Sequence, residues 1–184
     1  RWLIAKEIQP SYHSYGNGSG MRVSAAGFMA KSIEECIDLA TKTALPTHDH
    51  PEGIKGAVAT ALTIFYGMQG KDKDFIRKQV LDEYYPNWSG LTYEGIKPGY
   101  GFDETCQQTI PAALICFLES KDYEDCLKLA IALGGDADTL AAISGPMAYA
   151  FYKTMPEELI ANAKAKLPEW MLEVNEELDH YVNQ

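Results

Sequence analysis

Apolar residues recur at helical spacing along most of the chain. In residues 33–40 they stand three and four positions apart, directly after a capping box formed by Ser-Ile-Glu-Glu at residues 32–35. Residues 51–68 repeat the same steps, which predicts an amphipathic helix whose alanines pack closely against a neighbour. Residues 72–85 predict another helix. The first half of the chain is therefore expected to be helical wherever its apolar positions are periodic.

The second half continues this pattern. Residues 109–118 predict a helix with Pro111 in its first turn, where the missing N–H costs nothing, and residues 122–133 predict the next. Residues 136–152 are apolar around most of the helical circumference, which predicts a central helix buried on several sides. Two prolines are expected to open the terminal helices, Pro156 and Pro168.

Two segments lack a regular spacing of apolar residues. Residues 14–20 contain three glycines and predict a small-residue loop suited to close approach, and residues 86–104 predict a long irregular loop of a kind that is often functional. No segment alternates as a half-buried strand does, and no internal repeat is present. The sequence predicts an all-α fold, with residues 1–184 forming one domain.

Composition narrows the functions that fit this fold. A net charge of −10 excludes a broad electrostatic grip on nucleic acid, so a polyphosphate ligand must be held locally. The four cysteines show no metal-finger spacing and are expected to be reduced core or near-surface thiols, as in the cytosol. No apolar run reaches the 18 or so residues of a membrane span, and a soluble, cytoplasmic protein is expected. The first five residues read as the middle of an apolar helical face, so the natural polypeptide is expected to begin earlier.

The most informative stretch is Gly-Gly-Asp-Ala-Asp-Thr at residues 134–139, which opens the expected central helix. Burying unpaired carboxylates is costly, and Asp136 and Asp138 can converge only if one of them sits at or before the helix start. A hard cation such as Mg²⁺ or Mn²⁺ would resolve this charge problem. The alternative is that Asp136 is simply an N-cap, with Asp138 near the positive helix end.

Four segments in this order resemble the ADP-ribosylglycohydrolase family. They are the Gly-Gly-Asp-Ala-Asp-Thr turn continued to Gly145, the segment Ser-Tyr-Gly-Asn-Gly-Ser-Gly-Met-Arg at 14–22, Thr47-His48 before a helix, and residues 101–113. The resemblance covers nearly the whole chain. It implies a compact orthogonal multi-helix bundle and a hydrolase that removes ADP-ribose from an ADP-ribosylated protein or a small ADP-ribose conjugate.

The resemblance also implies roles for particular residues. Asp136, Asp138 and Thr139 would be metal ligands, and the two aspartates are the candidate catalytic carboxylates of a site that holds two Mg²⁺ ions in the complete family fold. The residues implied to contact ADP-ribose are Ser14, Tyr15, Asn17 and His48. Backbone amides and neutral polar groups in such a loop can hold a pyrophosphate without net positive charge.

Other residues near these segments have two interpretations each. Tyr15, Tyr100 and Phe102 are either stacking surfaces for adenine or ordinary loop packing. Arg22 either clamps a phosphate or holds the glycine loop against a carboxylate. A metal site at residues 48–50 is not expected, because a histidine at a helix entrance more often caps or orients its neighbours.

Family members also carry an earlier Gly-Asp-Ala-Leu-Gly type loop and a Thr-Asp-Asp or Ser-Asp-Asp motif that supplies the other half of the metal site, and neither occurs in this sequence. The chain by itself is therefore expected to bind metal weakly and to have little or no activity. The alternative functions are a non-catalytic module that binds ADP-ribose or a nucleotide, and a structural helical protein.

Overall fold

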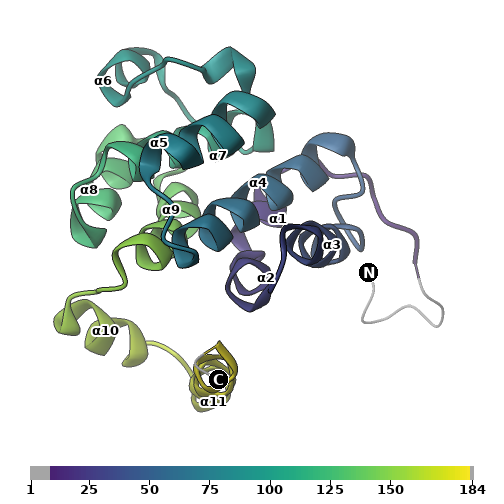
Figure 1. The fold of residues 1–184 in the computed structure, drawn as a ribbon, viewed down its shortest axis with the longest axis vertical. Coiled ribbons are helices and arrows are strands. Elements are labelled where there is room, and N and C mark those ends of the chain that lie inside the picture. Colours follow the sequence, from purple (N-terminus) through teal and green to yellow (C-terminus); the bar gives the residue numbers. More distant parts are fainter. Residues whose placement is uncertain (1–8, 183–184) are drawn as a thin grey trace.

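Helices account for all the regular secondary structure in residues 9–182, the part of the chain that the computed structural model describes. In this part, the only extended pairing is an isolated antiparallel bridge between Gly16 and Thr105. The earlier elements are α1 (Gly18–Met21), α2 (Ser24–Met29), α3 (Ile33–Ala44), α4 (Pro51–Met68), α5 (Lys73–Ile76) and the π-helical segment η2 (Arg77–Asp82). The later elements are η3 (Pro86–Trp88), α6 (Tyr93–Ile96), η4 (Lys97–Gly99), α7 (Cys106–Glu119), α8 (Tyr123–Leu133), α9 (Ala137–Tyr152), α10 (Glu157–Lys164) and α11 (Glu169–Val182). The predicted all-α multi-helix fold is confirmed (Figure 1).

Helices α4, α7 and α9 form the centre of the fold, and small residues let them approach closely. A Cβ atom added at Gly56 of α4 would lie 2.5 Å from Cys106 Sγ of α7. One added at Gly67 of α4 would lie 3.2 Å from the backbone of Ala150 in α9. The close packing expected of residues 51–68 is thus present, and α4 has the predicted bounds.

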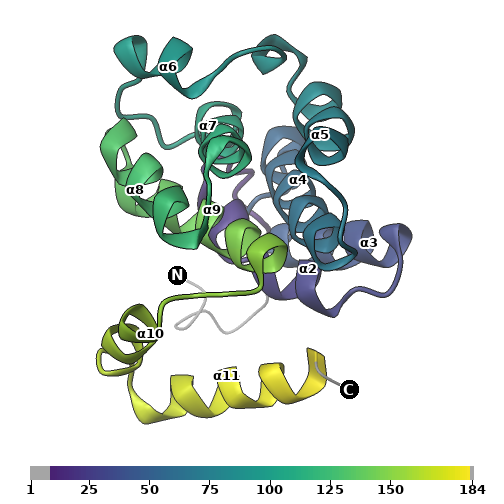
Figure 2. The ribbon, with the colours of Figure 1, turned by 60° about the vertical axis from the view of Figure 1, so that its left-hand side comes forward.

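Other helices cover this centre on several sides. Helices α2 and α3 pack on α4, and α8 packs on α9 (Figure 2). The helix at residues 137–152 is buried on several sides, as its continuous apolar pattern predicts. The largest side chains fully enclosed by these elements include Ile64, Ile110, Leu114, Phe117, Ile143 and Met147.

The predicted capping box at the start of α3 is present in a shifted form. Ser32 Oγ accepts a hydrogen bond of 3.2 Å from the backbone N–H of Glu35, as expected of an N-cap. The Glu35 carboxylate accepts a 2.7 Å bond from the N–H of Lys31, one residue before the cap. The first bond satisfies a backbone donor that the first helical turn leaves without a partner, and the second holds the residue before the cap, so together they fix the helix start.

One expectation about the first half was wrong, and a second is confirmed with a local difference. Residues 18–21 form the short helix α1 inside the expected glycine loop, because the Asn17 carbonyl accepts bonds of 2.9 and 3.1 Å from the next turn. Residues 72–85 are helical but contain the π segment η2. Its wider turn brings Ile76, Leu81 and Tyr85, spaced by five and four positions, to the buried side.

Two expectations about the middle of the chain also need correction. The segment 86–104 is not wholly irregular, because it contains the three short elements η3, α6 and η4. Helix α7 begins at Cys106, so Pro111 is its sixth residue and lies beyond the first turn. The backbone N–H of Cys106 donates a 2.9 Å hydrogen bond to the Tyr15 carbonyl, and this distant contact anchors the earlier start.

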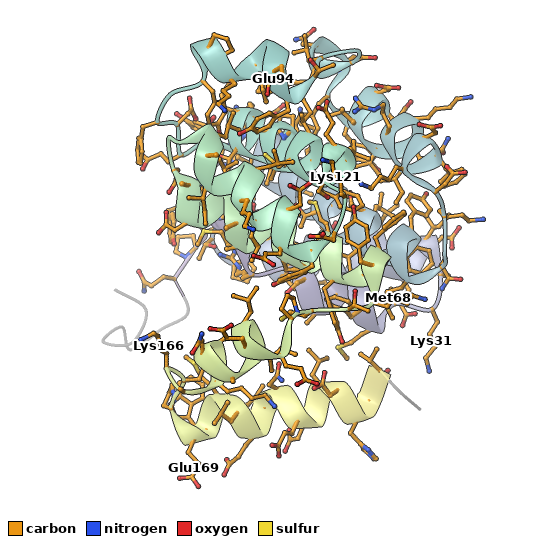
Figure 3. All side chains as sticks on the ribbon, turned by 90° about the vertical axis from the view of Figure 1, so that its left-hand side faces the viewer. Lys31, Met68, Glu94, Lys121, Lys166 and Glu169 are labelled. Atoms are coloured by element: carbon orange, nitrogen blue, oxygen red, sulfur yellow. The ribbon has the colours of Figure 1, made fainter. Side chains whose placement is uncertain are left out.

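The terminal helices α10 and α11 follow Pro156 and Pro168, as predicted. They lie beneath the other helices in Figure 2, and Lys166 and Glu169 mark the turn that joins them in Figure 3. Near the end of α11, Lys31 Nζ lies 6.0 Å from the centre of the Tyr181 ring. Neither helix has a fully buried residue, which agrees with a solvated acidic face on α11.

All four cysteines are buried and free, as expected of core thiols. Burial raises the pKa of the Cys36 thiol to about 12 and that of Cys106 to about 11. None of the helices within residues 9–182 is long and apolar enough to cross a bilayer. The apolar opening expected at residues 1–5 lies outside the described residues.

Candidate functional site

The turn between α8 and α9 positions Asp136. Gly134 and Gly135 have φ angles of 85° and 63°, a region that favours glycine, and they reverse the chain before the helix. Asp136 occupies the N-cap position of α9, but its side chain makes no capping hydrogen bond. Asp136 thus has the N-cap position that the simpler interpretation gave it, but its carboxylate points to a different partner and does not cap the helix.

That partner is Asn17 in the glycine-rich segment. Asn17 Nδ2 donates hydrogen bonds of 2.8 Å to Asp136 Oδ2 and of 3.2 Å to Thr109 Oγ1. Thr109 Oγ1 in turn donates a 3.0 Å bond to the Asp103 carbonyl. The backbone N–H of Asn17 donates to the Glu104 carbonyl at 2.8 Å. Asn17 is thus fixed between α7 and α9, and both hydrogens of its side-chain amide are used within the protein.

The other two predicted metal ligands also lie in the first turn of α9. Asp138 is exposed, whereas Thr139 is buried and its Oγ1 lies 3.8 Å from Met21 Sδ. Two carboxylates at the positive end of a helix are stabilised by the aligned backbone dipoles. The structure therefore places the half-buried Asp136, the exposed Asp138 and the buried Thr139 at one helix end.

His48 faces the glycine-rich segment from the turn before α4. Its Nδ1 lies 2.6 Å from Thr47 Oγ1 and 3.4 Å from Arg22 Nη2. Burial, and then the Arg22 charge, lower the pKa of the imidazole, so the ring is neutral at pH 7. An arginine can only donate, so Nδ1 accepts and Nε2 carries the hydrogen. A Cβ atom added at Gly18 would lie 3.3 Å from Nε2, which places this N–H against the glycine segment.

Ser14 and Arg22 shape the same segment. Ser14 Oγ accepts a 3.1 Å hydrogen bond from the N–H of Gly16, and the N–H of Ser14 donates to the Thr47 carbonyl at 3.2 Å. Arg22 donates to the Thr43 carbonyl at 3.1 Å and to Thr47 Oγ1 at 2.6 Å. Arg22 therefore holds the segment through a carbonyl and a hydroxyl, where the sequence suggested a carboxylate or a phosphate.

The candidate aromatic surfaces differ in exposure. Phe102 is 72% exposed and Tyr15 is 48% exposed, so each offers ring surface to a ligand. Tyr15 also packs against His50, with ring centres 5.1 Å apart. Tyr100 is half-buried, and burial raises the pKa of its hydroxyl far above the ordinary value. A Cβ atom added at Gly135 would lie 3.0 Å from Tyr100 Cε1, so the Tyr100 ring lies close to the turn that carries Asp136.

The side chains of residues 48–50 have protein partners in the described structure. His50 caps α4, because its Nδ1 accepts a 3.1 Å hydrogen bond from the N–H of Glu52. Asp49 accepts a 2.6 Å bond from Ser11 Oγ and lies 3.4 Å from His13 Nδ1. Within residues 9–182 no group of three or more histidine, cysteine, aspartate or glutamate side chains is placed to hold a metal.

The donors at the start of α9 nevertheless match the chemistry of a hard cation. Asp136 and Asp138 offer carboxylate oxygens, and Thr139 offers a hydroxyl oxygen. Mg²⁺ prefers such oxygen donors and usually keeps several waters, so one or two protein carboxylates suffice for a partial shell. The sequence had identified these three donors. It had not identified Asn17 as the partner of Asp136 or Met21 as the neighbour of Thr139, because nothing local in the sequence links positions so far apart.

Comparisons with known proteins identify the family and the fold of the chain. The family model described as ADP-ribosylglycohydrolase matches residues 1–184. The ADP-ribosylhydrolase ARH3 of Homo sapiens is 27% identical over an alignment of 183 residues. The alignment covers 76% of this chain and 50% of the human protein. An uncharacterized protein of Archaeoglobus fulgidus is 27% identical over 164 residues, covering 80% of this chain and 53% of its own length. The chain thus spans about half the length of the curated relatives it matches.

A solved structure shows the same fold. A chain of an ADP-ribosylglycohydrolase-related protein complex superposes with a TM-score of 0.71 at 22% sequence identity. The match covers 99% of this chain and 64% of that chain. Because the family model extends over the entire sequence and the helical fold agrees with it, the chain belongs to the ADP-ribosylglycohydrolase family.

Proposed function

We propose that this chain supplies one half of the active site of a Mg²⁺-dependent hydrolase that removes ADP-ribose from ADP-ribosylated proteins or small conjugates. The observation that carries the proposal is the 2.8 Å hydrogen bond between Asn17 Nδ2 and Asp136 Oδ2. It joins the glycine-rich segment to the helix end that carries the carboxylates. A ligand lying on that segment would therefore sit beside the metal ligands.

In this proposal Asp136, Asp138 and Thr139 hold Mg²⁺, with Mn²⁺ as a substitute. A bound divalent ion would polarise the substituent at the anomeric carbon and lower the pKa of a bound water. Asp136 is held in place by Asn17, whereas Asp138 is exposed and can reach solvent-borne ligands. The complete family site uses two ions, and further carboxylates from outside residues 9–182 would complete their coordination.

The glycine-rich segment is the proposed cradle for ADP-ribose. The neutral His48 directs its Nε2 hydrogen toward Gly18, and Ser14 holds the turn at Gly16 through its hydroxyl. Neutral N–H donors of this kind can bind a pyrophosphate without a cationic patch, which agrees with the net charge of −10. The exposed ring of Tyr15 provides a stacking surface for the adenine. Asn17 acts here mainly by positioning Asp136.

Thermal unfolding of the chain with Mg²⁺ and ADP-ribose tests this proposal. A ligand that binds only the native state raises the unfolding temperature. We expect ADP-ribose with Mg²⁺ to raise it more than ADP-ribose alone, and Asp138→Ala to remove the added effect. The control variant is Asp74→Ala, because Asp74 is exposed. Asp125 is unsuitable as a control, because it accepts a hydrogen bond at the start of α8.

Release of free ADP-ribose from a modified substrate separates catalysis from binding. Turnover that requires Mg²⁺ and Asp138 supports the hydrolase. The result to be distinguished is a shift in unfolding temperature without turnover, measured when the carboxylates required from outside residues 9–182 are present. That result would instead support a non-catalytic ADP-ribose-binding module. If neither ligand changes the unfolding temperature, the proposed site is wrong.

A further inference from the structure

The hydroxyl of Thr139 forms its hydrogen bond outside its own helix. Thr60 and Thr63 of α4 each donate to the carbonyl four residues earlier, at 2.9 and 2.8 Å, as threonines inside helices often do. Thr139, in the first turn of α9, instead donates from Oγ1 to the Met21 thioether of α1 at 3.8 Å. The side chain of Thr139 is therefore tied to a different element of the fold.

The place of Thr139 in α9 explains this difference. The residue four positions earlier is Gly135, which precedes the helix and has a φ angle of 63°, so it offers no helical carbonyl. A threonine in a helix has two accessible χ1 rotamers, because its hydroxyl can bond to the preceding turn. Since Thr139 is buried, its neighbour on α1 decides which rotamer is occupied.

Helix α1 holds Met21 in place beside α9. The Met21 N–H donates to the Asn17 carbonyl at 3.1 Å. A Cβ atom added at Gly20 would lie 2.5 Å from Ile110 Cδ1 and 3.6 Å from Ile143 Cδ1, so α1 approaches both α7 and α9 closely. The backbone that carries the thioether is thus fixed on both sides of the first turn of α9.

Helix α1 and its N-cap residue Asn17 contact two of the three proposed metal ligands. Asn17 donates to the Asp136 carboxylate at 2.8 Å, and Met21 accepts from the Thr139 hydroxyl. A hydroxyl oxygen can offer its lone pairs to a cation only while its hydrogen points elsewhere. A thioether suits this task, because it accepts a hydrogen bond but is too soft a ligand to compete for Mg²⁺.

We infer that Met21 is a positioning residue of the metal site: its thioether takes the hydroxyl hydrogen of Thr139 and so turns the oxygen lone pairs toward the cation. The inference rests on the proposed metal site and adds to it a residue that does not touch the ion. Partners of this kind fix the orientation of a metal ligand and raise its basicity. Loss of the thioether should therefore free the Thr139 rotamer in the metal-free chain and weaken metal binding.

NMR of the metal-free chain tests the first consequence, because couplings of the Thr139 methyl carbon to the backbone report its χ1 angle. We expect one rotamer in the parent and averaging between two in Met21→Leu, which keeps an apolar side chain but removes the acceptor. Met21→Gln offers an amide oxygen at similar reach and should restore the single rotamer. Met171→Leu is the matched control, because Met171 is 39% exposed and Met21 is 42% exposed. It should leave the Thr139 couplings unchanged.

Titration with Mn²⁺, followed by the broadening of NMR signals from residues 136–140, tests the second consequence. Met21→Leu should weaken Mn²⁺ binding about three- to tenfold, the effect of one hydrogen bond, and Met21→Gln should restore most of the affinity. In a Thr139→Val chain, Met21→Leu should have no further effect, because the hydroxyl through which Met21 acts is gone. Met171→Leu should bind Mn²⁺ as the parent does.

An unchanged Thr139 rotamer or an unchanged Mn²⁺ affinity in Met21→Leu overturns the inference. An equal loss of affinity in Met21→Gln also overturns it, because Met21 would then act by packing alone. The proposed metal site has a separate test in Asp138→Ala, which must weaken Mn²⁺ binding whatever Met21 does. If Asp138→Ala and Thr139→Val both bind Mn²⁺ as the parent does, the metal site is wrong and the inference falls with it.

Discussion

Asn17 and Asp136 are 119 positions apart in the sequence, and a 2.8 Å hydrogen bond joins their side chains. The bond gives the carboxylate a donor at the point where it would otherwise cap α9. A hydrogen bond to a charged acceptor contributes more than one between neutral groups. The contact therefore anchors the glycine-rich segment, and it orients one of the proposed metal ligands. The stability of the segment and the affinity for metal should therefore change together.

Replacing Asn17 tests this coupling. Asn17→Ala should lower the free energy of unfolding in urea by about 1–3 kcal/mol, because it removes donors to Asp136 and Thr109. It should also weaken Mg²⁺ binding measured by calorimetry. Asn162→Ala, at an exposed position of α10, is the control and should change neither quantity. Equal effects of the two variants would contradict the coupling.

Replacing Gly18 tests whether the Nε2 hydrogen of His48 can reach a ligand bound on the glycine-rich segment. A methyl group at residue 18 would lie 3.3 Å from His48 Nε2 and would cover its N–H. Gly18→Ala should therefore weaken ADP-ribose binding at least severalfold. The unfolding temperature should change little, because the helix preference of alanine at the start of α1 offsets the shift of a few tenths of an ångström that the His48 ring must make.

The matched control for that variant is Gly99→Ala. Nothing lies within 4 Å of a Cβ atom added at Gly99, so the same chemical change meets open space. ADP-ribose binding should be unaffected in the control. If both alanine variants bind ADP-ribose as the parent does, His48 does not face the ligand across Gly18.

The pH dependence of stability should report the neutral state of His48. Burial and the Arg22 charge lower its pKa in the folded chain, whereas the unfolded chain keeps the ordinary value near 6.5. As the pH falls below about 6.5, the unfolded state binds a proton before the folded state does, so stability decreases through the folded pKa. Unfolding in urea between pH 7.5 and 5 should show this loss.

His48→Gln should flatten that part of the profile, because glutamine does not titrate. His180→Gln, at an exposed position of α11, should leave the slope at its parental value. If the slope of unfolding free energy against pH stays the same in His48→Gln, the pH dependence comes from other groups.

How far the sequence predicted the structure depends on whether the determining contacts are local. The period of apolar residues and a proline at the first position predicted the bounds of α4 at Pro51–Met68 correctly. Helix α1 was missed because glycines at residues 18 and 20 oppose helix formation, and its packing rests on distant neighbours such as Ile110. The earlier start of α7 was missed for the same reason, since the Tyr15 carbonyl anchors it.

The candidate site follows the same division. Residues 134–139 could be identified from the sequence because two glycines, two aspartates and a threonine stand together. The role of Asn17 as the partner of Asp136 could not, because 119 residues separate them and an asparagine in a glycine-rich loop has many uses. Neither could the contact of Thr139 with Met21, which depends on how α1 packs against α9.

Lys73 provides a test of stability away from the candidate site. Its Nζ donates to Tyr152 Oη at 2.8 Å and lies 5.3 and 5.5 Å from the ring centres of Phe117 and Phe151. Lys73→Met keeps most of the side-chain length but removes the donors and the cation–π contacts, so it should lower the free energy of unfolding by about 1–3 kcal/mol. Lys78→Met removes the same charge from an exposed position of η2 and should change it by less than about 0.5 kcal/mol. Urea unfolding of both variants at pH 7 compares them directly. If Lys78→Met lowers the free energy of unfolding as much as Lys73→Met does, the loss comes from the change in net charge and not from the aromatic contacts of Lys73.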